Sequence, residues 1–488
     1  MHHLTAKSPS PAKEKVNLVW LKRDLRIQDH RPLAFASEEC QKGIPAIALY
    51  CFESDYWNSD KASPRQRKIV WDSLHIMAQD FEEACPGGRI FMAECRSADE
   101  VIARILEQYD VQRILTHQET HNLWTFERDI RVQKIAKAHK VEILEAFQNG
   151  VNRAWTPRNW SDLWKEWVTA PLVETPKHWV GPKNEVEVMQ KCGVNPVDTS
   201  TTIITNHPSD IPHATLLSFL NKRCLTGRGY RAEMSGGELA AIACSRISQH
   251  LTWGGISTKE AYHIAKTYGD HCTDRHKHPH MNSFITRLLW RDNFIQQFES
   301  HHSMELYCMN PAMEHARGSD TESLQRFVQG QTGYPFVDAC MRRLNETGWI
   351  TFRARAMLVS FAAYALNLDW RAFGPHLAQN FIDYEPGIHY CQLQMQSGTT
   401  LRAPTRIYNP LKQSVEHDPK GDFIRLWIPE LKSISGVGIH TPENRIRNGY
   451  PTAIVNPARL WKTMRANGPQ SPKKTTPQLE FFFEEGAA

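Results

Sequence analysis

The chain has 488 residues, of which 41% are hydrophobic and 23% are charged, and its formal net charge is +5. A chain of this length exceeds what one hydrophobic core organises, so we expect two domains. There is no apolar run of roughly 18 residues and no secretory signal, so we expect no membrane span and a cytoplasmic monomer. The small positive charge permits nucleic-acid binding without indicating it.

The cysteines predict reduced thiols rather than a metal site. The 11 cysteines are scattered, and no two lie closer in sequence than Cys85 and Cys95. No CxxC pair exists, so neither a zinc site nor a thioredoxin-type site is expected. The histidine-rich run HCTDRHKHPH (271–280) is expected to be a solvated loop.

Residues 16–149 alternate strand and helix patterns after a disordered tail at 1–15. Short apolar runs rich in β-branched residues predict strands at 16–21, 44–52, 89–94, 113–118 and 141–147. Amphipathic stretches between them predict helices at 65–84, 98–109 and 122–139. This alternation is typical of a doubly wound parallel sheet, a Rossmann-like α/β domain. No GxGxxG follows the first strand, so a dinucleotide fingerprint is absent.

The remaining chain divides into a connection, a helical domain and a tail. Residues 150–212 are rich in proline and polar residues and predict a surface connection with short helices. Residues 213–460 show the helical period throughout and predict an all-helical domain. Residues 461–488 are polar at first and predict a flexible tail.

A set of motifs resembles the photolyase/cryptochrome family of blue-light flavoproteins. The motifs are VWLKRDLRIQDHRPL (19–33), TGYPFVDACMRRLNETGW (332–349), FRARAM (352–357), LNLDWRAF (366–373), RIYNP (406–410) and FIRLWIPEL (423–431). The resemblance covers roughly residues 16–455. It implies an α/β antenna-type domain, a helical domain that binds flavin adenine dinucleotide (FAD), and a role in DNA repair or light signalling.

The resemblance also implies the residues of the flavin pocket. CSRIS (244–248) stands at the family's phosphate-binding run, and WRDNF (290–294) stands at its cation-bearing element. Arg355 and Asp383 match an ion pair beside the flavin ring, and His389 stands where an asparagine commonly faces it, which would put a titratable group there. The cofactor-binding set is Tyr230, Ser245, Ile247, Ser248, Phe284, Arg291, Arg355, Asp383, Glu385 and His389.

The family's electron relay of three aromatic residues is incomplete in this sequence. Trp370 matches the middle position, but Phe327 and Leu393 occupy the outer and inner ones. Phenylalanine and leucine are too hard to oxidise to relay electrons. Four aromatic residues are candidate substitutes, which the sequence does not place: Tyr390, Tyr364, Trp349 and Trp253.

The substrate cavity implied by the resemblance is also altered. Trp290 matches the cavity tryptophan, but Arg287 replaces a glutamate of dimer photolyases and Met395 replaces their second tryptophan. The histidine pair of (6-4) photolyases falls on Phe352 and Ala356. Arg353 and Arg406 match positions that contact DNA phosphate, which supplies affinity without specificity.

Two further sites are predicted outside the flavin pocket. A second, antenna chromophore of folate or deazaflavin type is possible, with Glu119 as a candidate contact or else a surface helix cap. Near the C-terminus, Gln478, Leu479, Phe481 and Phe482 resemble the peptide with which bacterial repair proteins dock on the replication sliding clamp. The alternative for this segment is that its phenylalanines fold back on the helical domain.

The favoured function is therefore light-driven repair of UV-damaged DNA, with Trp290, Arg287, His389 and Trp370 as candidate catalytic residues. The alternative is a cryptochrome-type photoreceptor that binds FAD without repairing DNA. The cationic residues favour repair, whereas the altered cavity favours the photoreceptor.

Overall fold

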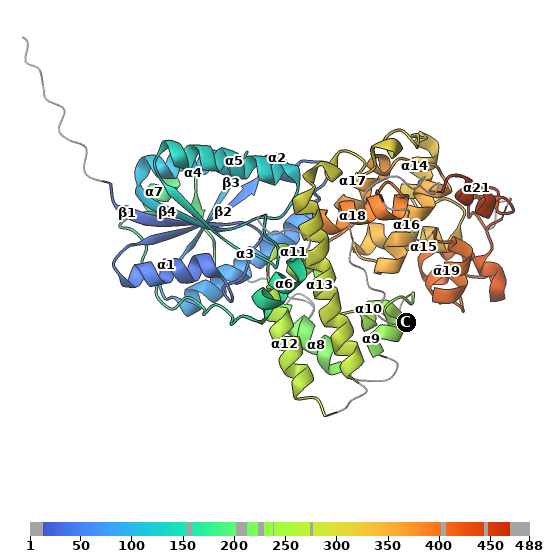
Figure 1. Cartoon of the computed structure of the whole chain (residues 1–488), viewed down its shortest axis with the longest axis horizontal. Helices are drawn as coiled ribbons and strands as arrows, with labels where there is room; N and C mark the ends of the chain where they lie inside the picture. Colours follow the sequence, from blue (N-terminus) through green and yellow to red (C-terminus); the bar gives the residue numbers. More distant parts are fainter. Residues whose placement is uncertain are drawn as a thin grey trace, which may run out of the picture.

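We analysed a computed structural model of the protein. It describes residues 13–153, 159–201, 212–222, 229–237, 239–273, 277–401, 407–443 and 448–468. Figure 1 shows an α/β domain beside a helical domain, with the long helix α13 (His278–Ser300) running between them. No helix among the described residues is long and apolar enough to cross a membrane.

The α/β domain is built on one sheet with the strand order β5-β4-β1-β2-β3-β6. The strands are β1 (Lys15–Leu21), β2 (Ala46–Glu53), β3 (Ile90–Cys95), β4 (Asp110–His117), β5 (Glu142–Ala146) and β6 (Asn195–Pro196). The first five strands pair in parallel, as predicted. The short β6 pairs antiparallel with β3. Because β6 lies in the predicted surface connection, part of that segment belongs to the sheet edge instead.

Both faces of the sheet are covered by helices, which explains the apolar runs of its strands. The helices of this domain are α1 (Arg31–Gln41), α2 (Ser54–Trp57), α3 (Pro64–Ala84), α4 (Ala98–Gln108) and α5 (Leu123–Ala138). Neighbouring residues of β1 enter different cores: Val19 and Leu21 join one apolar cluster, and Leu18 and Trp20 join the other. The expected doubly wound α/β domain is confirmed.

The connection between the domains carries two short helices, in keeping with the prediction of short helices in this segment. It contains α6 (Trp160–Thr169) and α7 (Glu185–Lys191). Trp160 and Trp164 of α6 are buried in an apolar cluster with residues of α13, and the Trp164 indole N–H donates to Asp292 at 3.0 Å. Trp160 and Trp164, which are large apolar residues in an otherwise polar segment, therefore anchor the connection to the helical domain.

The described part of the helical domain holds one dominant core. Its α-helices besides α13 are α8 (Pro212–Lys222), α9 (Gly229–Glu233), α10 (Leu239–Ala243), α11 (Ser248–Trp253), α12 (Thr258–Asp270), α14 (Thr321–Val328), α15 (Pro335–Thr347), α16 (Phe352–Tyr364), α17 (Trp370–Asn380), α18 (Pro386–Ser397), α19 (Pro410–His417), α20 (Asp422–Trp427) and α21 (Leu460–Ala466). Tyr334, Phe361 and Phe373 are among its largest fully buried side chains. Helix α13 begins at His278, so the end of the histidine-rich run is helical rather than a loop.

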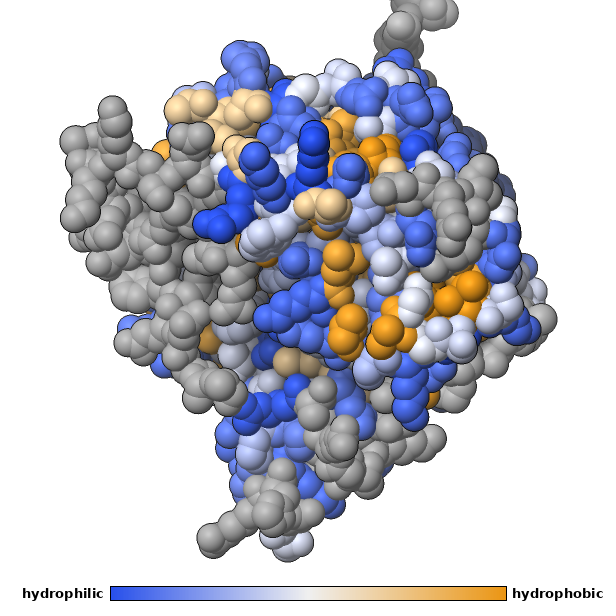
Figure 2. Space-filling model, turned by 90° about the vertical axis from the view of Figure 1, so that its right-hand side faces the viewer, coloured by the Kyte–Doolittle hydropathy of each residue, from blue (hydrophilic) through white to orange (hydrophobic). Residues whose placement is uncertain are grey.

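The outer face of the helical domain carries no continuous apolar surface in the view of Figure 2. Hydrophobic side chains there form small groups among hydrophilic ones. Large apolar residues that α19, α20 and α21 expose include Val415, Leu426 and Trp461. Scattered exposed apolar residues of this kind are normal on a protein surface.

The two domains meet at the end of α11. Gly254 has a φ of 78°, and a Cβ atom at this position would lie 2.0 Å from the carbonyl oxygen of Arg23. Only glycine permits this close approach. Arg26 donates to the Gly254 carbonyl at 3.2 Å, and Gln66 of α3 donates to the carbonyls of Ala378 and Phe381 at 2.8 Å each. The α/β domain is thereby bonded to the backbone that precedes α18.

Candidate functional site

The predicted ion pair forms at the entry to α18. Arg355 of α16 bonds Asp383 at 3.0 Å, and its guanidinium also donates to the Ile350 carbonyl at 3.1 Å. The same guanidinium lies over the Phe381 ring, 4.1 Å from its centroid. The second carboxylate oxygen of Asp383 is buried and has no hydrogen-bond partner among the described residues. Buried polar atoms in proteins almost always have a hydrogen-bond partner. The unpaired Asp383 oxygen is therefore available to a hydrogen-bond donor on a bound ligand.

A second carboxylate lies two residues further along. Glu385 accepts from Arg291 of α13 at 3.1 Å and from Arg23 of the α/β domain at 3.3 Å. Arg291 also bonds Asp292 at 2.8 Å and the Leu251 carbonyl at 3.1 Å. The sequence predicts Arg291 and Glu385 as flavin contacts, and the structure brings them together as an ion pair at the domain interface.

The predicted phosphate-binding run turns sharply before α11. Arg246 has a φ of 59°, in the left-handed region, and Ser248 begins the helix. Non-glycine residues rarely hold this conformation, which often marks a functional site. Ser245 and Ser248 are half-buried, whereas Ile247 is buried in an apolar cluster. Ile247 and its cluster neighbour Phe284 contribute core packing, and their contact with a flavin stays a prediction.

Sequence reasoning missed Arg246. Its guanidinium stacks over Trp349, 4.1 Å from the ring centroid, and burial lowers its pKa. No carboxylate of the described residues forms an ion pair with it. The sequence signal that could have identified it is its place as the arginine within the predicted phosphate-binding run.

The positive charges of four arginines act to lower the pKa of the Cys244 thiol at this turn. Burial raises the pKa of Cys244 to about 11, and the arginine charges oppose this shift. These arginines come from the phosphate-binding run and from helices α13, α15 and α16: Arg246, Arg287, Arg343 and Arg355. A concentration of positive charge with hydroxyls nearby suits a phosphate-bearing ligand.

His389 lies inside the helical domain on α18. Its ring contacts Phe381, Tyr384 and Tyr390, with centroid separations of 6.3, 5.3 and 5.1 Å. Burial lowers the pKa of His389 to about 3, and its Nε2 atom has no partner among the described residues. The expected titratable group beside the flavin is therefore neutral at physiological pH.

The residues on the substrate side lie mostly at the surface. Trp290 is 40% exposed on α13, and the Arg287 guanidinium lies 5.1 Å from the Trp290 ring centroid and 5.8 Å from that of Tyr230. Arg353 is half-buried and donates to Ser235 at 3.3 Å, and Met395 is half-buried on α18. Arg406 and residues 478–482 lie outside the described residues.

The three positions predicted to correspond to the family's electron relay are all buried in the helical domain. Phe327 is fully buried against Phe373, with ring centroids 5.8 Å apart, and Leu393 is buried on α18. Trp370 is also buried and contacts Tyr390 at 6.1 Å. The other candidate substitutes lie in different places: Tyr364 under Arg317, Trp349 under Arg246, and Trp253 at the domain interface.

Glu119 in the α/β domain is neither a surface residue nor a helix cap. It is buried and forms an ion pair with Arg128, which also bonds Glu53 at 2.6 Å and Asp129 at 2.7 Å. The cap of α5 is Asn122, which accepts from the Thr125 N–H. Glu119 lines a pocket with Trp20 and Tyr50, so its role as an antenna contact stays a prediction.

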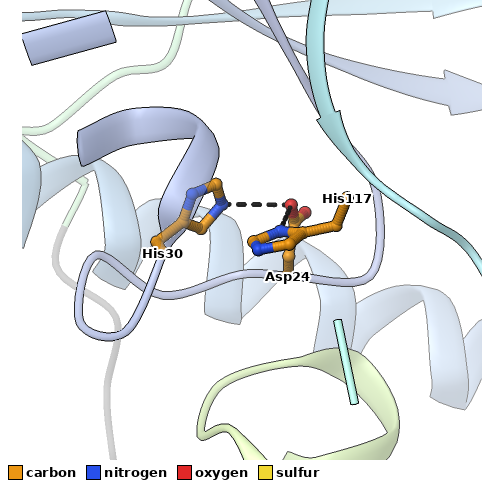
Figure 3. Close-up of side chains that lie close together, drawn as sticks. All are labelled: Asp24, His30 and His117. Carbon is orange, nitrogen blue, oxygen red and sulfur yellow. Dashed lines mark hydrogen bonds and ion pairs between the residues drawn. The ribbon is translucent and has the colours of Figure 1, made fainter. Parts of the chain in front are cut away.

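A second buried cluster joins Asp24, His30 and His117 (Figure 3). Asp24 Oδ2 lies 3.0 Å from His30 Nε2 and 2.7 Å from His117 Nδ1. The Leu33 N–H donates to His30 Nδ1, so the proton of the neutral ring sits on Nε2, 3.0 Å from Asp24 Oδ2. Although burial opposes it, contact with the two histidines holds the pKa of Asp24 well below its usual range. A metal would need the lone pair that this proton occupies, so we interpret the cluster as a hydrogen-bonded brace.

FAD, the cofactor that the sequence motifs imply, fits the residues of this site. Its pyrophosphate needs cations and hydroxyls, which Arg246, Ser245 and Ser248 supply at one turn. Its ring needs polar contacts at its reactive edge, and the open acceptor of Asp383 beside Arg355 offers one. The neutral His389 adds an unpaired ring nitrogen.

Comparison with known proteins points to one family. Residues 17–162 match the family model described as DNA photolyase, and residues 284–467 match the FAD binding domain of DNA photolyase. The chain is 26% identical over 478 residues to a deoxyribodipyrimidine photo-lyase of Escherichia coli strain K12, covering 90% of this chain and 95% of the relative.

Two solved structures share the fold over almost the whole chain. A cryptochrome of Synechocystis sp. PCC6803 has a TM-score of 0.78 at 21% identity, covering 94% of this chain and 100% of its own. A class III photolyase of Agrobacterium tumefaciens has a TM-score of 0.75 at 21% identity, covering 95% of this chain and 98% of its own. With the motifs and the FAD-binding domain in place, the chain belongs to the photolyase/cryptochrome family of FAD-containing blue-light proteins.

Proposed function

We propose that this protein is a light-dependent DNA repair lyase that acts on a pyrimidine photoproduct flipped out of the strand. The observation that carries the proposal is Trp290, an aromatic side chain that is 40% exposed on the helix that also carries Arg291. An enzyme that works on a base must take that base out of the stack and hold it against aromatic or apolar groups. An exposed indole beside an arginine provides both a stacking surface and a charge.

Cationic side chains support the binding of DNA. Arg287 lies against Trp290, and Arg353 lies half-buried on α16. Arginines of this kind contact phosphates and position the strand, while the lesion is selected by the cavity. Damaged pairs flip at the lowest cost, which favours a photoproduct as substrate.

When bound and reduced, FAD supplies the electron that light drives into the photoproduct. The contribution of this chain is electrostatic. The Arg355–Asp383 pair is fixed before any reaction by the Ile350 carbonyl and the Phe381 ring. A preorganised cation near the ring stabilises negative charge there without rearrangement. Neutral His389 contributes a dipole but no competing charge.

A cryptochrome-type photoreceptor is the second candidate, and the altered cavity favours it. Arg287 replaces an acidic group that dimer photolyases use, and Met395 replaces a stacking tryptophan. An arginine cannot accept a hydrogen bond, so a lesion would have to be held differently.

Product analysis separates the two functions. The FAD-loaded protein, kept reduced, would be illuminated with blue light in the presence of UV-damaged single- and double-stranded oligonucleotides, and both cyclobutane dimers and (6-4) adducts would be quantified. We expect light-dependent loss of one lesion, and a Trp290→Ala variant that retains FAD should lose most of that activity. Intact lesions in every substrate would contradict repair and favour the photoreceptor.

We also infer a second chromophore in the α/β domain, of folate or deazaflavin type. The pocket lined by Glu119, Trp20 and Tyr50 combines aromatic rings with buried charge and supports such a ligand. The purified protein should then release a second near-UV or blue-absorbing compound besides FAD on denaturation. Release of FAD alone from protein purified in the dark would contradict this inference.

Docking on the sliding clamp through residues 478–482 stays a proposal from sequence, since these residues lie outside the described ones. Deletion of residues 478–483 should abolish binding to purified clamp while leaving FAD content unchanged. Unchanged clamp affinity would contradict the proposal.

A further inference from the structure

We propose that the flavin pocket receives electrons through an aromatic chain that crosses the domain interface and leaves the protein in the α/β domain. The proposal rests on FAD binding and holds for a repair enzyme and for a photoreceptor. We call the residues of this route the interface chain: His389, Tyr384, His121 and Tyr56, ending at Trp57 and Trp124.

The route of the family is closed at its outer end. Trp370 contacts Tyr390 at 6.1 Å, but it is only 2% exposed. The neighbouring aromatic position, Phe327, stacks against Phe373, and neither phenylalanine is readily oxidised. An electron hole that reached Trp370 would therefore have no oxidisable partner toward solvent among the ring contacts of the described residues.

The interface chain, in contrast, is continuous. The ring centroids of His389 and Tyr384 lie 5.3 Å apart, those of Tyr384 and His121 lie 5.8 Å apart, and those of His121 and Tyr56 lie 5.4 Å apart. His389 and Tyr384 belong to the helical domain, whereas His121 and Tyr56 belong to the α/β domain. The rings at each step are close together, so the two tyrosines are the oxidisable members of the chain and the two histidines bridge the gaps beside them.

The chain ends at two half-buried tryptophans that line the pocket assigned above to a second chromophore, and it reaches solvent there when that pocket is empty. Tyr56 contacts Trp57 at 5.0 Å and Trp124 at 5.9 Å, and both indoles are half-buried. Trp57 also contacts Trp253 at 6.0 Å, and the Trp253 N–H donates to the Ile382 carbonyl at 2.9 Å, next to Asp383. Trp253 thus gives a second branch from the flavin pocket to the same exit.

The side chains of the chain are neutral before any electron moves. Burial raises the pKa values of Tyr56 and Tyr384, so both phenols stay protonated until they are oxidised. The ring of His121 lies between them and is also neutral, because burial and the charges of Arg23 and Arg128 lower its pKa.

Each electron that reaches the flavin is replaced by one electron from a thiol in solution. One electron passes from Tyr384 or Trp253 toward the photoexcited flavin, and Tyr56 and then Trp57 refill the vacancy. The oxidised Trp57 takes one electron from a thiol in solution, which loses its proton and becomes a thiyl radical. Two thiyl radicals then combine to a disulfide.

Light-driven reduction of the bound flavin with dithiothreitol tests the route. The full-length, FAD-loaded protein would be illuminated with blue light, while flavin absorbance and the electron paramagnetic resonance signal of tryptophan radicals are recorded. We expect the double variant Trp57→Phe, Trp124→Phe to lose the tryptophan radical and to be reduced at least tenfold more slowly. The single variant Tyr56→Phe should slow flavin reduction, because it removes the branch through Tyr384 and leaves the branch through Trp253. It replaces the double variant in this test if the double variant does not fold.

A matched control gives the opposite expectation. Trp179→Phe removes a buried tryptophan that packs on Phe81 outside the chain, and this variant should be reduced at the wild-type rate. Trp370→Phe removes the family's middle relay and tests the competing route. Slow reduction in Trp370→Phe together with a normal rate in the double variant would overturn the proposal. Repair assayed after chemical reduction in the dark does not need the chain, so its failure would count against the proposed function alone.

Discussion

At the scale of single residues, Arg246 is the side chain that most clearly prepares the site for an anion. It keeps a half-buried positive charge in a left-handed backbone conformation. Both features cost stability, and a bound pyrophosphate would offset that cost. We expect Arg246→Ala to weaken FAD binding by about 10- to 100-fold, because a charge-assisted hydrogen bond contributes about 1.5–3 kcal/mol.

Arg246→Gly distinguishes binding from folding. Glycine adopts the backbone conformation of Arg246 without strain, so this variant should match or exceed the wild type in thermal stability of the cofactor-free protein. Its FAD affinity, measured by flavin fluorescence, should fall as in Arg246→Ala, while the exposed Arg96→Ala should leave it unchanged. A normal affinity in Arg246→Gly would show that the guanidinium does not bind the cofactor.

His389 makes the stability of the protein depend on pH in a defined direction. Its folded-state pKa is about 3, against about 6.5 in the unfolded chain, so only the unfolded state takes up a proton between these values. Stability is therefore lost as pH falls below 6.5. Between pH 7.5 and 5.5 this histidine removes about 1.4 kcal/mol of unfolding free energy.

His389→Asn should make that loss smaller by the same amount, measured by urea unfolding at the two pH values. The exposed His139→Asn is the matched control. An identical pH dependence in His389→Asn and wild type would mean that His389 is not held neutral in the folded protein.

At the scale of elements, α16 positions both Arg353 and Arg355, and its first turn depends on one hydroxyl. Thr351 accepts the Ala354 N–H at 3.2 Å as the helix cap. Thr351→Ala should cost about 1 kcal/mol of unfolding free energy, and Thr351→Ser should restore it. Equal stability of the two variants in urea unfolding would argue against the cap.

At the scale of the whole molecule, Glu385 ties the domains together by accepting from Arg23 and Arg291. Removing it leaves two cations at a largely buried interface, so Glu385→Ala should cost roughly 3 kcal/mol. Hydrogen exchange should rise at residues 21–26 and 382–386. The exposed Arg31–Glu38 pair provides the control, since Glu38→Ala should change stability by less than about 0.5 kcal/mol. Unchanged exchange at both segments of Glu385→Ala would contradict the role of this residue.

The sequence alone determined the order of the domains, the five parallel strands and the family, because each depends on local periodicity or on contiguous motifs. It also predicted the ion pair of Arg355 and Asp383, because each residue lies in a segment that matches the family and the two side chains have opposite charges. It did not reveal β6, the anchoring role of Trp160 and Trp164, or the burial of Glu119, since these depend on contacts between distant segments.

Only the tertiary structure decided how the charged and aromatic residues are used. Burial made His389 neutral, strain at one turn distinguished Arg246, and docking of the domains joined Glu385 to Arg23. The same docking placed Tyr384 beside His121, although these residues are far apart in the chain. Sequence patterns specify what a residue can do, but pKa, strain and ring contacts arise from neighbours that only the folded chain brings together.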